Sequence, residues 1–332
     1  MSSVVELPGT ESPEPRAVRP AAGIAAIASA LPDRVVHNDE IAARIGVDGD
    51  WIAQRTGILE RRHAPEGDTL AELAAKAGGA ALERAGIEPA DVDLILVATS
   101  TPDERVPTAA PLVAEWLGAA NAGAIDIGAA CTGFLSALEL AAAATESGRA
   151  GVTLVIGAEL MSRVLDLDDP RTAGLFGDGA GAAVVVPGGE ARIGPVRLRA
   201  DGAGSRAVTA SHEENLVRMD GRATFRAAVQ RLSEVSLEVA EAAGVELAEI
   251  DLFVYHQANI RILSAVGDRL GLQPERVVDS IARHGNTSAA SIPLALDAAL
   301  ADGRLDRGAR VLVGAFGAGL TWGGAIIEWG TA

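Results

Sequence analysis

The sequence predicts an α/β fold made of two similar halves, and three observations carry this prediction. Short continuous apolar runs, typical of strands buried on both faces, alternate with alanine-rich segments that carry helix signals. Hydrophobic residues make up 48% of the chain but aromatic residues only 3%, so the core must be aliphatic. The third observation is a repeat: residues 85–97, AGIEPADVDLILV, return 158 positions later as residues 243–255, AGVELAEIDLFVY. A repeat period of 158 residues is too long for the units of a solenoid protein, so we expect a duplicated domain.

The elements of the first half follow residues 1–20, which are rich in Ser, Pro and Glu and predict a disordered extension. Strands are expected at four short apolar runs, residues 22–30, 92–99, 152–157 and 182–186. Helices are expected at residues 69–86 and 108–118, and on both sides of a glycine-containing break within residues 38–63. We place the two halves of the duplication at residues 21–190 and 191–332.

Cys131, the only cysteine of the chain, lies where an alanine- and leucine-rich helix begins. Unpaired backbone N–H groups and the helix dipole favour a thiolate there, so we expect a lowered thiol pKa and a nucleophile. The alternative is a small buried apolar residue. Residues 131–149 resemble residues 286–304, which lie 155 positions later. At this spacing Cys131 and Asn286 would start equivalent central helices and face one crevice.

His256 follows the predicted strand of residues 250–255 directly, and its counterpart in the first half is Ala98. Taken alone, His256 fits a satisfied core histidine, and Asn286 fits an ordinary helix cap. The combination with Cys131 changes this interpretation. Each of the three lies at the end of a strand or the start of a helix, and the duplication brings them towards one axis. We therefore predict a site formed by Cys131, His256 and Asn286.

The composition excludes several classes of function. A net charge of −17 argues against nucleic acid or an anionic membrane surface as the main partner. A single cysteine rules out an intrachain disulfide, and neither a membrane-spanning apolar run nor a signal-peptide pattern is present, so we expect a cytoplasmic protein. The glycine clusters at residues 177–181 and 317–319 precede strands rather than helices, so neither is a dinucleotide motif. We interpret the first as a tight turn and the second as active-site backbone.

Six motifs occur in order along the chain: DWIAQRTGILERR, AACTGF, LFGDGAGAAVV, HQANIRI, RHGNTSAASIPLALD and FGAGLTWGGA. Over roughly residues 22–330 they resemble the β-ketoacyl-acyl-carrier-protein synthase III enzymes of the thiolase superfamily. The resemblance implies the thiolase-like duplicated fold with five layers, αβαβα. True thiolases use a second cysteine, which this chain lacks, and the elongating synthases have a second histidine where Asn286 stands.

The resemblance assigns roles to the predicted site. Cys131 would take an acyl group from acyl-CoA, with the backbone N–H groups of Cys131 and Ala318 as the oxyanion hole. His256 and Asn286 would hydrogen-bond the thioester carbonyl of a malonyl group, and neither a metal nor a redox cofactor is implied. The implied CoA-binding positions are Trp51, Arg55, Arg163, Gly221 and Asn259. The implied acyl-pocket residues are Phe225 and Val106, the latter reaching into the partner of a homodimer, and the implied carrier-docking residues are Arg226 and Arg261.

We therefore expect an acyltransferase that condenses an acyl-CoA primer with malonyl-acyl carrier protein. This decarboxylative Claisen reaction would give 3-oxoacyl-acyl carrier protein and initiate fatty-acid synthesis. Family members with a bulky aromatic at the position of Val106 are restricted to short primers, so valine implies longer or branched primers. One alternative is an enzyme of the same fold in a polyketide or other secondary pathway, with an unusual primer or acceptor. Another is a non-catalytic scaffold subunit, against which the intact Cys131, His256 and Asn286 argue.

Overall fold

The computed structural model describes residues 20–330, so the predicted extension, except for Pro20, lies outside the described residues. The strands are β1 (Ala22–Ala30), β2 (Val35–His37), β3 (Glu60–Arg62), β4 (Leu94–Ala98), β5 (Gly123–Ile127), β6 (Thr153–Leu160), β7 (Asp178–Pro187), β8 (Ala191–Ala200), β9 (Val208–Ala210), β10 (Val217–Met219), β11 (Leu252–Tyr255), β12 (Arg310–Gly317) and β13 (Thr321–Glu328). The helices are α1 (Asn38–Ile45), α2 (Gly49–Thr56), α3 (Leu70–Ala85), α4 (Ala109–Leu117), α5 (Gly133–Ser147), α6 (Gly221–Ala243), α7 (Ile260–Leu270), α8 (Ile281–His284) and α9 (Ser291–Ala301). Every strand and helix predicted in the first half is present, with ends shifted by a few residues.

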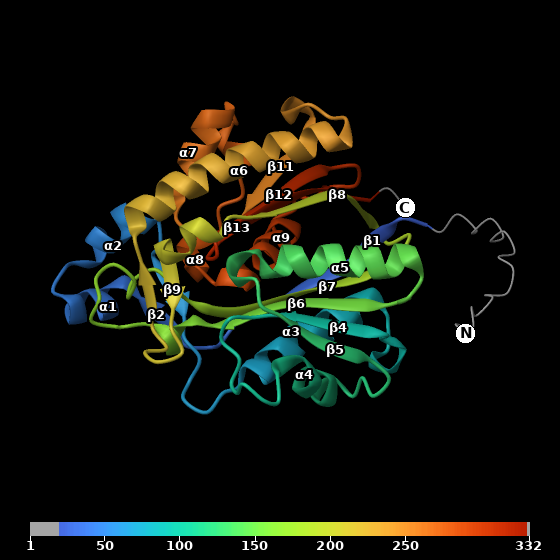
Figure 1. Cartoon of the computed structure of the whole chain (residues 1–332), viewed down its shortest axis with the longest axis horizontal. Coiled ribbons are helices and arrows are strands. Elements are labelled where there is room, and N and C mark those ends of the chain that lie inside the picture. Colours follow the sequence, from blue (N-terminus) through green and yellow to red (C-terminus); the bar gives the residue numbers. More distant parts are fainter. Residues whose placement is uncertain (1–19, 331–332) are drawn as a thin grey trace, which may run out of the picture.

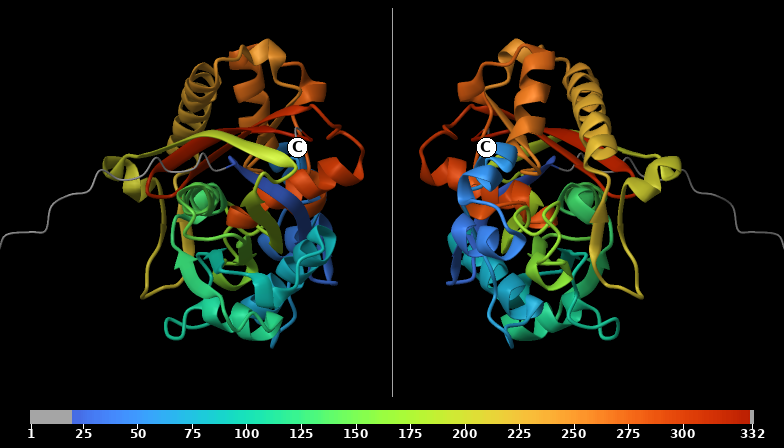
Figure 2. Two further views of the ribbon diagram at one scale, coloured as in Figure 1. Left: turned by 90° about the vertical axis from the view of Figure 1, so that its right-hand side faces the viewer. Right: turned by 90° about the vertical axis from the view of Figure 1, so that its left-hand side faces the viewer.

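The elements stack in five layers, and Figures 1 and 2 show their order. The outer helices α3 and α4 pack on one sheet region, in the order β5-β4-β6-β7-β1, through an aliphatic cluster. The outer helices α6 and α7 cover the other region, β8-β13-β12-β11. Helices α5 and α9 lie between the two regions and contribute to the central hydrophobic cluster. The five-layered αβαβα duplication predicted from the sequence is confirmed. Within residues 20–330, no helix is both long enough and apolar enough to cross a bilayer.

The two sheet regions are joined at one edge. Strand β1 pairs with β7 along its length and also with β8, where Gly23 lies opposite Arg192 and Ile24 opposite Ala191. A Cβ atom at Gly23 would lie 2.4 Å from the carbonyl oxygen of Gly189, so glycine is required where the chains cross. Nine of the thirteen described strands therefore form one hydrogen-bonded sheet across the two halves, and the other four form the two-stranded sheets β2-β3 and β9-β10.

The repeat continues into the short 3₁₀ turns that precede the central helices. Turn η2 (Ala130–Thr132) leads into α5, and turn η7 (Ser288–Ala290) leads into α9, 158 positions later. Both turns begin with a left-handed residue that is not glycine, at φ 47° in the first half and φ 48° in the second. Both halves therefore keep an unfavourable backbone conformation in the turn just before the central helix.

This alignment corrects one prediction. At a spacing of 158 the residue equivalent to Cys131 is Ala289, whereas Asn286 lies just before turn η7. The spacing of 155 holds only at the far ends of the helices, where Gly148 and Gly303 share the left-handed conformation. The difference of three arises because α9, with 11 residues, is four residues shorter than α5, with 15, and Asp302 adds one residue between the end of α9 and Gly303.

The cluster at residues 177–181 is also not the tight turn that we predicted, because β7 begins at Asp178 and runs through it. Its glycines make room for the middle layer instead. A Cβ atom at Gly181 would lie 2.7 Å from the Cβ of Pro293 at the start of α9. In neighbouring β6, a Cβ at Gly157 would lie 2.4 Å from the carbonyl oxygen of Ala289. Glycine thus lets turn η7 and helix α9 lie directly on the sheet.

We predict that Gly157→Ala lowers the free energy of unfolding by about 1–3 kcal/mol, the usual cost of overpacking, because backbone atoms of turn η7 block the new methyl group. Chemical denaturation measures this change. Gly79→Ala is the matched control, since its Cβ would meet only Leu117 at 3.5 Å, and it should stabilise helix α3 by about 0.5–1 kcal/mol. Equal stability of the two variants would show that the backbone of η7 is not in tight contact with β6 at Gly157.

Candidate active site

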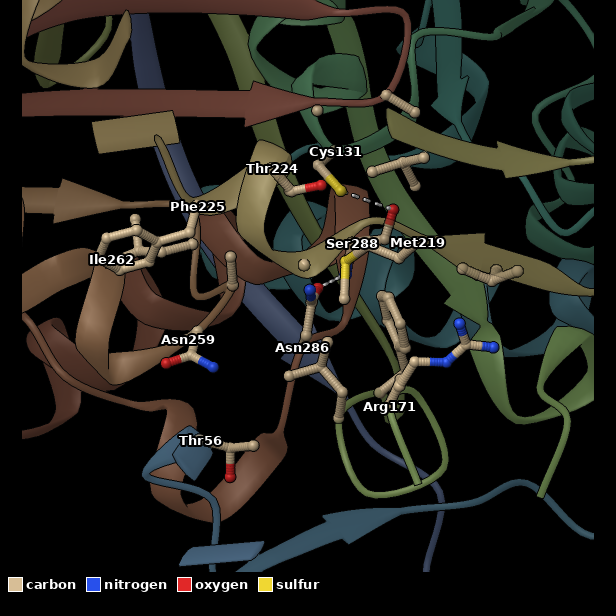
Figure 3. Close-up of a pocket in the computed structure, with 18 of the residues that line it drawn as sticks. Thr56, Cys131, Arg171, Met219, Thr224, Phe225, Asn259, Ile262, Asn286 and Ser288 are labelled. Atoms are coloured by element: carbon tan, nitrogen blue, oxygen red, sulfur yellow. Dashed lines mark hydrogen bonds between the residues drawn. The ribbon is translucent and has the colours of Figure 1, made fainter. Parts of the chain in front are cut away.

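A cavity of about 690 Å³ opens at the starts of both central helices and holds most of the predicted site. Figure 3 shows part of its wall, with Cys131 and Asn286 close to Ser288. The predicted residues that line it are Trp51, Arg55, Cys131, Gly221, Phe225, His256, Asn259, Arg261, Asn286 and Ala318. The structure therefore brings together the three residues predicted to carry the chemistry.

Cys131 belongs to turn η2, between strand β5 and helix α5. Its side chain is partly exposed, and it faces the cavity. The end of β12 also lines the cavity, and it passes so close that a Cβ at Gly317 would lie 3.0 Å from the backbone nitrogen of Cys131. Glycine at 317 therefore leaves the Cys131 N–H side of the cavity open, as an oxyanion hole formed with Ala318 requires.

The thiol of Cys131 does not have the lowered pKa that we predicted. Burial, together with the nearby charge of Glu159, raises its pKa to about 12, although a hydrogen bond with Ser288 opposes the rise. The prediction relied on the field of a helix N-terminus, but α5 starts only at Gly133 and the desolvation of a thiolate dominates. The resting side chain is consequently a thiol, and its proton must go to a base when Cys131 attacks.

His256 directly follows β11, is only 2% exposed, and is held by a hydrogen bond of 2.6 Å between its Nδ1 and the Oγ of Ser291. Burial lowers the pKa of the imidazole to about 4, so the ring is neutral near pH 7. The Ser291 hydroxyl also accepts the N–H of Gln257 at 3.4 Å. With the Ser291 hydroxyl donating its own proton to Nδ1, the ring proton of His256 lies on Nε2, and His256 is then a neutral donor.

Asn286 is fixed by its backbone and its side chain together. Its N–H donates to the carbonyl of Leu175 at 2.9 Å, and its carbonyl accepts the N–H of Gly177 at 3.0 Å. Its side-chain Oδ1 accepts the N–H of Ser288 at 2.9 Å. With Oδ1 occupied, the amide NH₂ group is the part of the side chain that remains available to a ligand in the cavity.

The charged residues that line the cavity, within the described part of the chain, are all arginines: Arg55, Arg171, Arg222 and Arg261. The charge of the cavity lining is therefore positive, although the net charge of the chain is −17. The guanidinium of Arg55 lies 4.0 Å from the ring centre of Trp51, and Asn259 donates to the Arg55 carbonyl at 3.0 Å. Arg171 and Arg222 were not predicted, since no motif or spacing marks them. Arg171 is paired with Asp169 at 2.8 Å, so Arg55, Arg222 and Arg261 are the arginines that suit a ligand with phosphate groups.

Three predicted residues lie outside the cavity wall. Arg163 pairs with Asp103 at 2.8 Å, and Asp103 in turn accepts the N–H of Leu70 at the start of α3. Val106 is 85% exposed, and Arg226 lies on the exposed side of α6. The CoA-binding role of Arg163, the acyl-pocket role of Val106 and the docking role of Arg226 stay predictions.

Comparison with known proteins identifies relatives over the whole fold. The family model for 3-oxoacyl-[acyl-carrier-protein] synthase III matches residues 125–202, and the model for the C-terminal part of that synthase matches residues 240–329. A β-ketoacyl-[acyl-carrier-protein] synthase III of Streptomyces coelicolor is 45% identical over 96% of this chain and 96% of its own length. A β-ketoacyl-[acyl-carrier-protein] synthase III of Bordetella petrii is 46% identical, over 91% of this chain and 96% of its own.

Solved structures agree with the sequence relatives. The crystal structure of 3-oxoacyl-[acyl-carrier-protein] synthase III from Aquifex aeolicus superimposes with a TM-score of 0.90 at 41% identity, covering 93% of this chain and 100% of that one. The priming β-ketosynthase of the R1128 polyketide pathway also has a TM-score of 0.90, at 38% identity, with 98% and 100% covered.

We predict that nitrogen NMR of the five histidines will show His256 neutral from pH 8 down to about 4, with its proton on Nε2. Ser291→Ala removes the donor to Nδ1 and should populate the tautomer with the proton on Nδ1. A wild-type ring that titrates near pH 6.5, or that carries its proton on Nδ1, would contradict this description of the site.

Proposed function

The chain belongs to the 3-oxoacyl-[acyl-carrier-protein] synthase III family, and on that premise we propose that it initiates fatty-acid synthesis. The enzyme would condense an acyl-CoA primer with malonyl-acyl carrier protein to 3-oxoacyl-acyl carrier protein. One observation carries this proposal: a thiol, a neutral imidazole and an amide NH₂ group share one cavity whose described charged residues are arginines. Relatives at 45% and 46% identity carry the synthase III name, so a role in polyketide synthesis is not favoured.

In the first half-reaction Cys131 attacks the thioester carbonyl of the primer and CoA departs. The N–H groups of Cys131 and Ala318 stabilise the tetrahedral oxyanion. Trp51 offers a flat apolar surface for the adenine, and the cavity arginines offer charge to the phosphates of CoA. Gly221 and Asn259 would contact the pantetheine arm of the acyl-CoA, and Phe225 would contact its acyl group.

In the second half-reaction the malonyl thioester loses carbon dioxide. The Nε2–H of His256 and the NH₂ group of Asn286 donate to its carbonyl oxygen and stabilise the enolate that forms. Neutral donors suit this step, because a charged imidazolium is costly in a buried site. The enolate carbon attacks the acyl-cysteine and releases the product. Thiol, imidazole and amide suffice for both steps, so we propose no metal or redox cofactor.

We predict that Cys131→Ala abolishes acyl loading, read as the added mass on the intact protein, without loss of the fold. Asn286→Ala should still load acyl groups, because Asn286 acts on the malonyl carbonyl, but its condensation should fall by about 10²-fold or more. Acylation of the Cys131→Ala protein on another residue would reject Cys131 as the nucleophile. Equal losses of the Asn286→Ala protein in both half-reactions would reject the division of labour.

We further propose a homodimer located in the cytoplasm. Strand β5 lies at one end of the sheet, so the side of its backbone that faces away from β4 has no strand partner in the described chain. Large apolar side chains on and around it are exposed: Ile125 at 52%, Trp116 at 60% and Val106 at 85%. A second copy that pairs along β5 would cover this surface and bring Val106 towards the partner's cavity. Arg226 and Arg261 would meet the carrier protein.

We predict that Val106→Phe shifts the preference for primers towards acetyl-CoA and away from branched or medium chains, because the aromatic ring fills the end of the partner's pocket. Each methylene that the wild-type pocket buries should add about 0.8 kcal/mol to binding. Specificity constants for a series of acyl-CoAs measure the shift. A monomer at micromolar concentration, or an unchanged order of preference, would show that Val106 does not line a pocket in a partner.

A further inference from the structure

A buried carboxylate lies one hydroxyl group away from the thiol of Cys131. Glu159, on strand β6, is 0% exposed, and its Oε1 accepts a hydrogen bond of 2.8 Å from the Oγ of Ser288. The same Oγ is 3.6 Å from the sulfur of Cys131, which donates to it, as the dashed line in Figure 3 shows. Cys131, Ser288 and Glu159 thus form a continuous path for a proton.

The surroundings of Glu159 are those of an ionised carboxylate. Its Oε2 accepts the hydroxyl of Thr101 at 2.7 Å and the N–H of Ser100 at 3.0 Å. The Thr101 hydroxyl itself accepts the N–H of Leu160 at 2.8 Å, so its proton is free to point at Glu159. Hydrogen bonds from Ser288, Thr101 and Ser100 stabilise the ionised form of this carboxyl group. Burial nevertheless raises the pKa of Glu159, which makes it a better proton acceptor than an exposed glutamate.

His256 is unsuited to take the thiol proton. Its Nδ1 is occupied by the hydroxyl of Ser291 at 2.6 Å, and the proposed second half-reaction requires its Nε2 to carry a proton. A base must be found elsewhere, since the thiol of Cys131 has a pKa of about 12. Glu159 is the charged group that acts on this thiol within the described chain.

The backbone conformation of Ser288 makes the path possible. At φ 48° its N–H points to Oδ1 of Asn286 while its side chain lies between the thiol and the carboxylate. In strand β6, Gly157 and Glu159 are two residues apart and share a face. The missing side chain at Gly157 lets turn η7 approach closely enough for Ser288 to reach Glu159.

We propose that Ser288 and Glu159 form a proton relay that takes the thiol proton of Cys131 during acyl loading and returns it during condensation. As the bond between sulfur and the acyl carbon forms, the thiol proton moves to the Ser288 oxygen and the Ser288 proton moves to Glu159. The bond to CoA breaks, and CoA leaves as a thiolate that takes a proton from water. When the enolate displaces Cys131, the cysteine thiolate recovers its proton from Glu159 through Ser288. Each turnover therefore takes up one proton from solvent, the one that CoA receives, and Glu159 ends as the carboxylate with which it began.

The first test is Ser288→Ala, followed by single-turnover acyl loading and mass spectrometry. Alanine fits the backbone, because Ala130 holds the same conformation in the first half. We expect loading at pH 7 to slow by about 10²-fold, the usual contribution of a positioned base. The deficit should shrink as pH rises towards ~9, where hydroxide takes the proton directly; His256 stays neutral throughout this range. Ser136→Ala, which removes a hydroxyl from the following turn of α5, is the control and should load normally.

A constant deficit at every pH, or loading within threefold of the wild type, would overturn the relay, because a structural role does not respond to hydroxide. The rate at which iodoacetamide alkylates Cys131 is a second test of the relay, and it does not depend on acyl-CoA. In Glu159→Gln the relay predicts slower alkylation at pH 7. If Glu159 only opposes the thiolate by its charge, removing that charge should speed alkylation and would contradict the relay.

This inference rests on the proposed function for its electrophile, and the two fail differently. A wild-type protein that accepts no acyl group from any acyl-CoA would overturn the proposed function, while the alkylation rates would still decide the relay. Normal wild-type loading with an unaffected Ser288→Ala protein would overturn the relay alone. If Glu159→Gln does not fold, Ser288→Ala decides the matter in both assays.

Discussion

The site depends on the contact between two backbones, turn η7 of the second half and strand β6 of the first. Only glycine at 157 allows this contact, because any side chain there would meet the carbonyl of Ala289. The contact sets the position of Ser288, and Ser288 in turn hydrogen-bonds Asn286, Cys131 and Glu159. One close approach therefore fixes the nucleophile, an enolate donor and a buried carboxylate relative to one another.

The duplication explains why such a site arises at this place. Both halves begin their central helix with a 3₁₀ turn whose first residue is left-handed, and the two turns are in contact through the hydrogen bond between Cys131 and Ser288. The sequences of the turns have diverged to different tasks. The first half has Cys131 where the second has Ala289, and the second has Ser288 where the first has Ala130. The nucleophile and the residue that bridges it to Glu159 thus occupy neighbouring positions of one ancestral turn.

Much of this organisation could be predicted from the sequence, because it follows local patterns. Continuous apolar runs revealed the buried strands, and the position of His256 after one of them marked it for the site. The errors concern properties that depend on contacts between distant segments. The thiol pKa of Cys131 is set by burial and by Glu159, which lies 28 positions away in the chain, and the glycines of residues 177–181 make room for α9 rather than forming a turn. Glu159 could have been found in the sequence, because a carboxylate at the end of an apolar run is unusual. All eight residues of this strand, β6, are buried. Arg171 and Arg222 had no such signal, since only the folded chain brings them to the cavity.

The central claim is that residues of the two halves act as one unit on the Cys131 thiol, and a double-mutant cycle across the halves tests it most directly. The measurement is the single-turnover rate of acyl loading at pH 7 for Ser288→Ala, for Glu159→Gln and for the double variant. If both residues serve one proton path, the double variant should be no slower than the slower single variant, because the path is already broken. A double variant whose loss equals the product of the two single losses would show that Ser288 and Glu159 act independently, and would contradict the account.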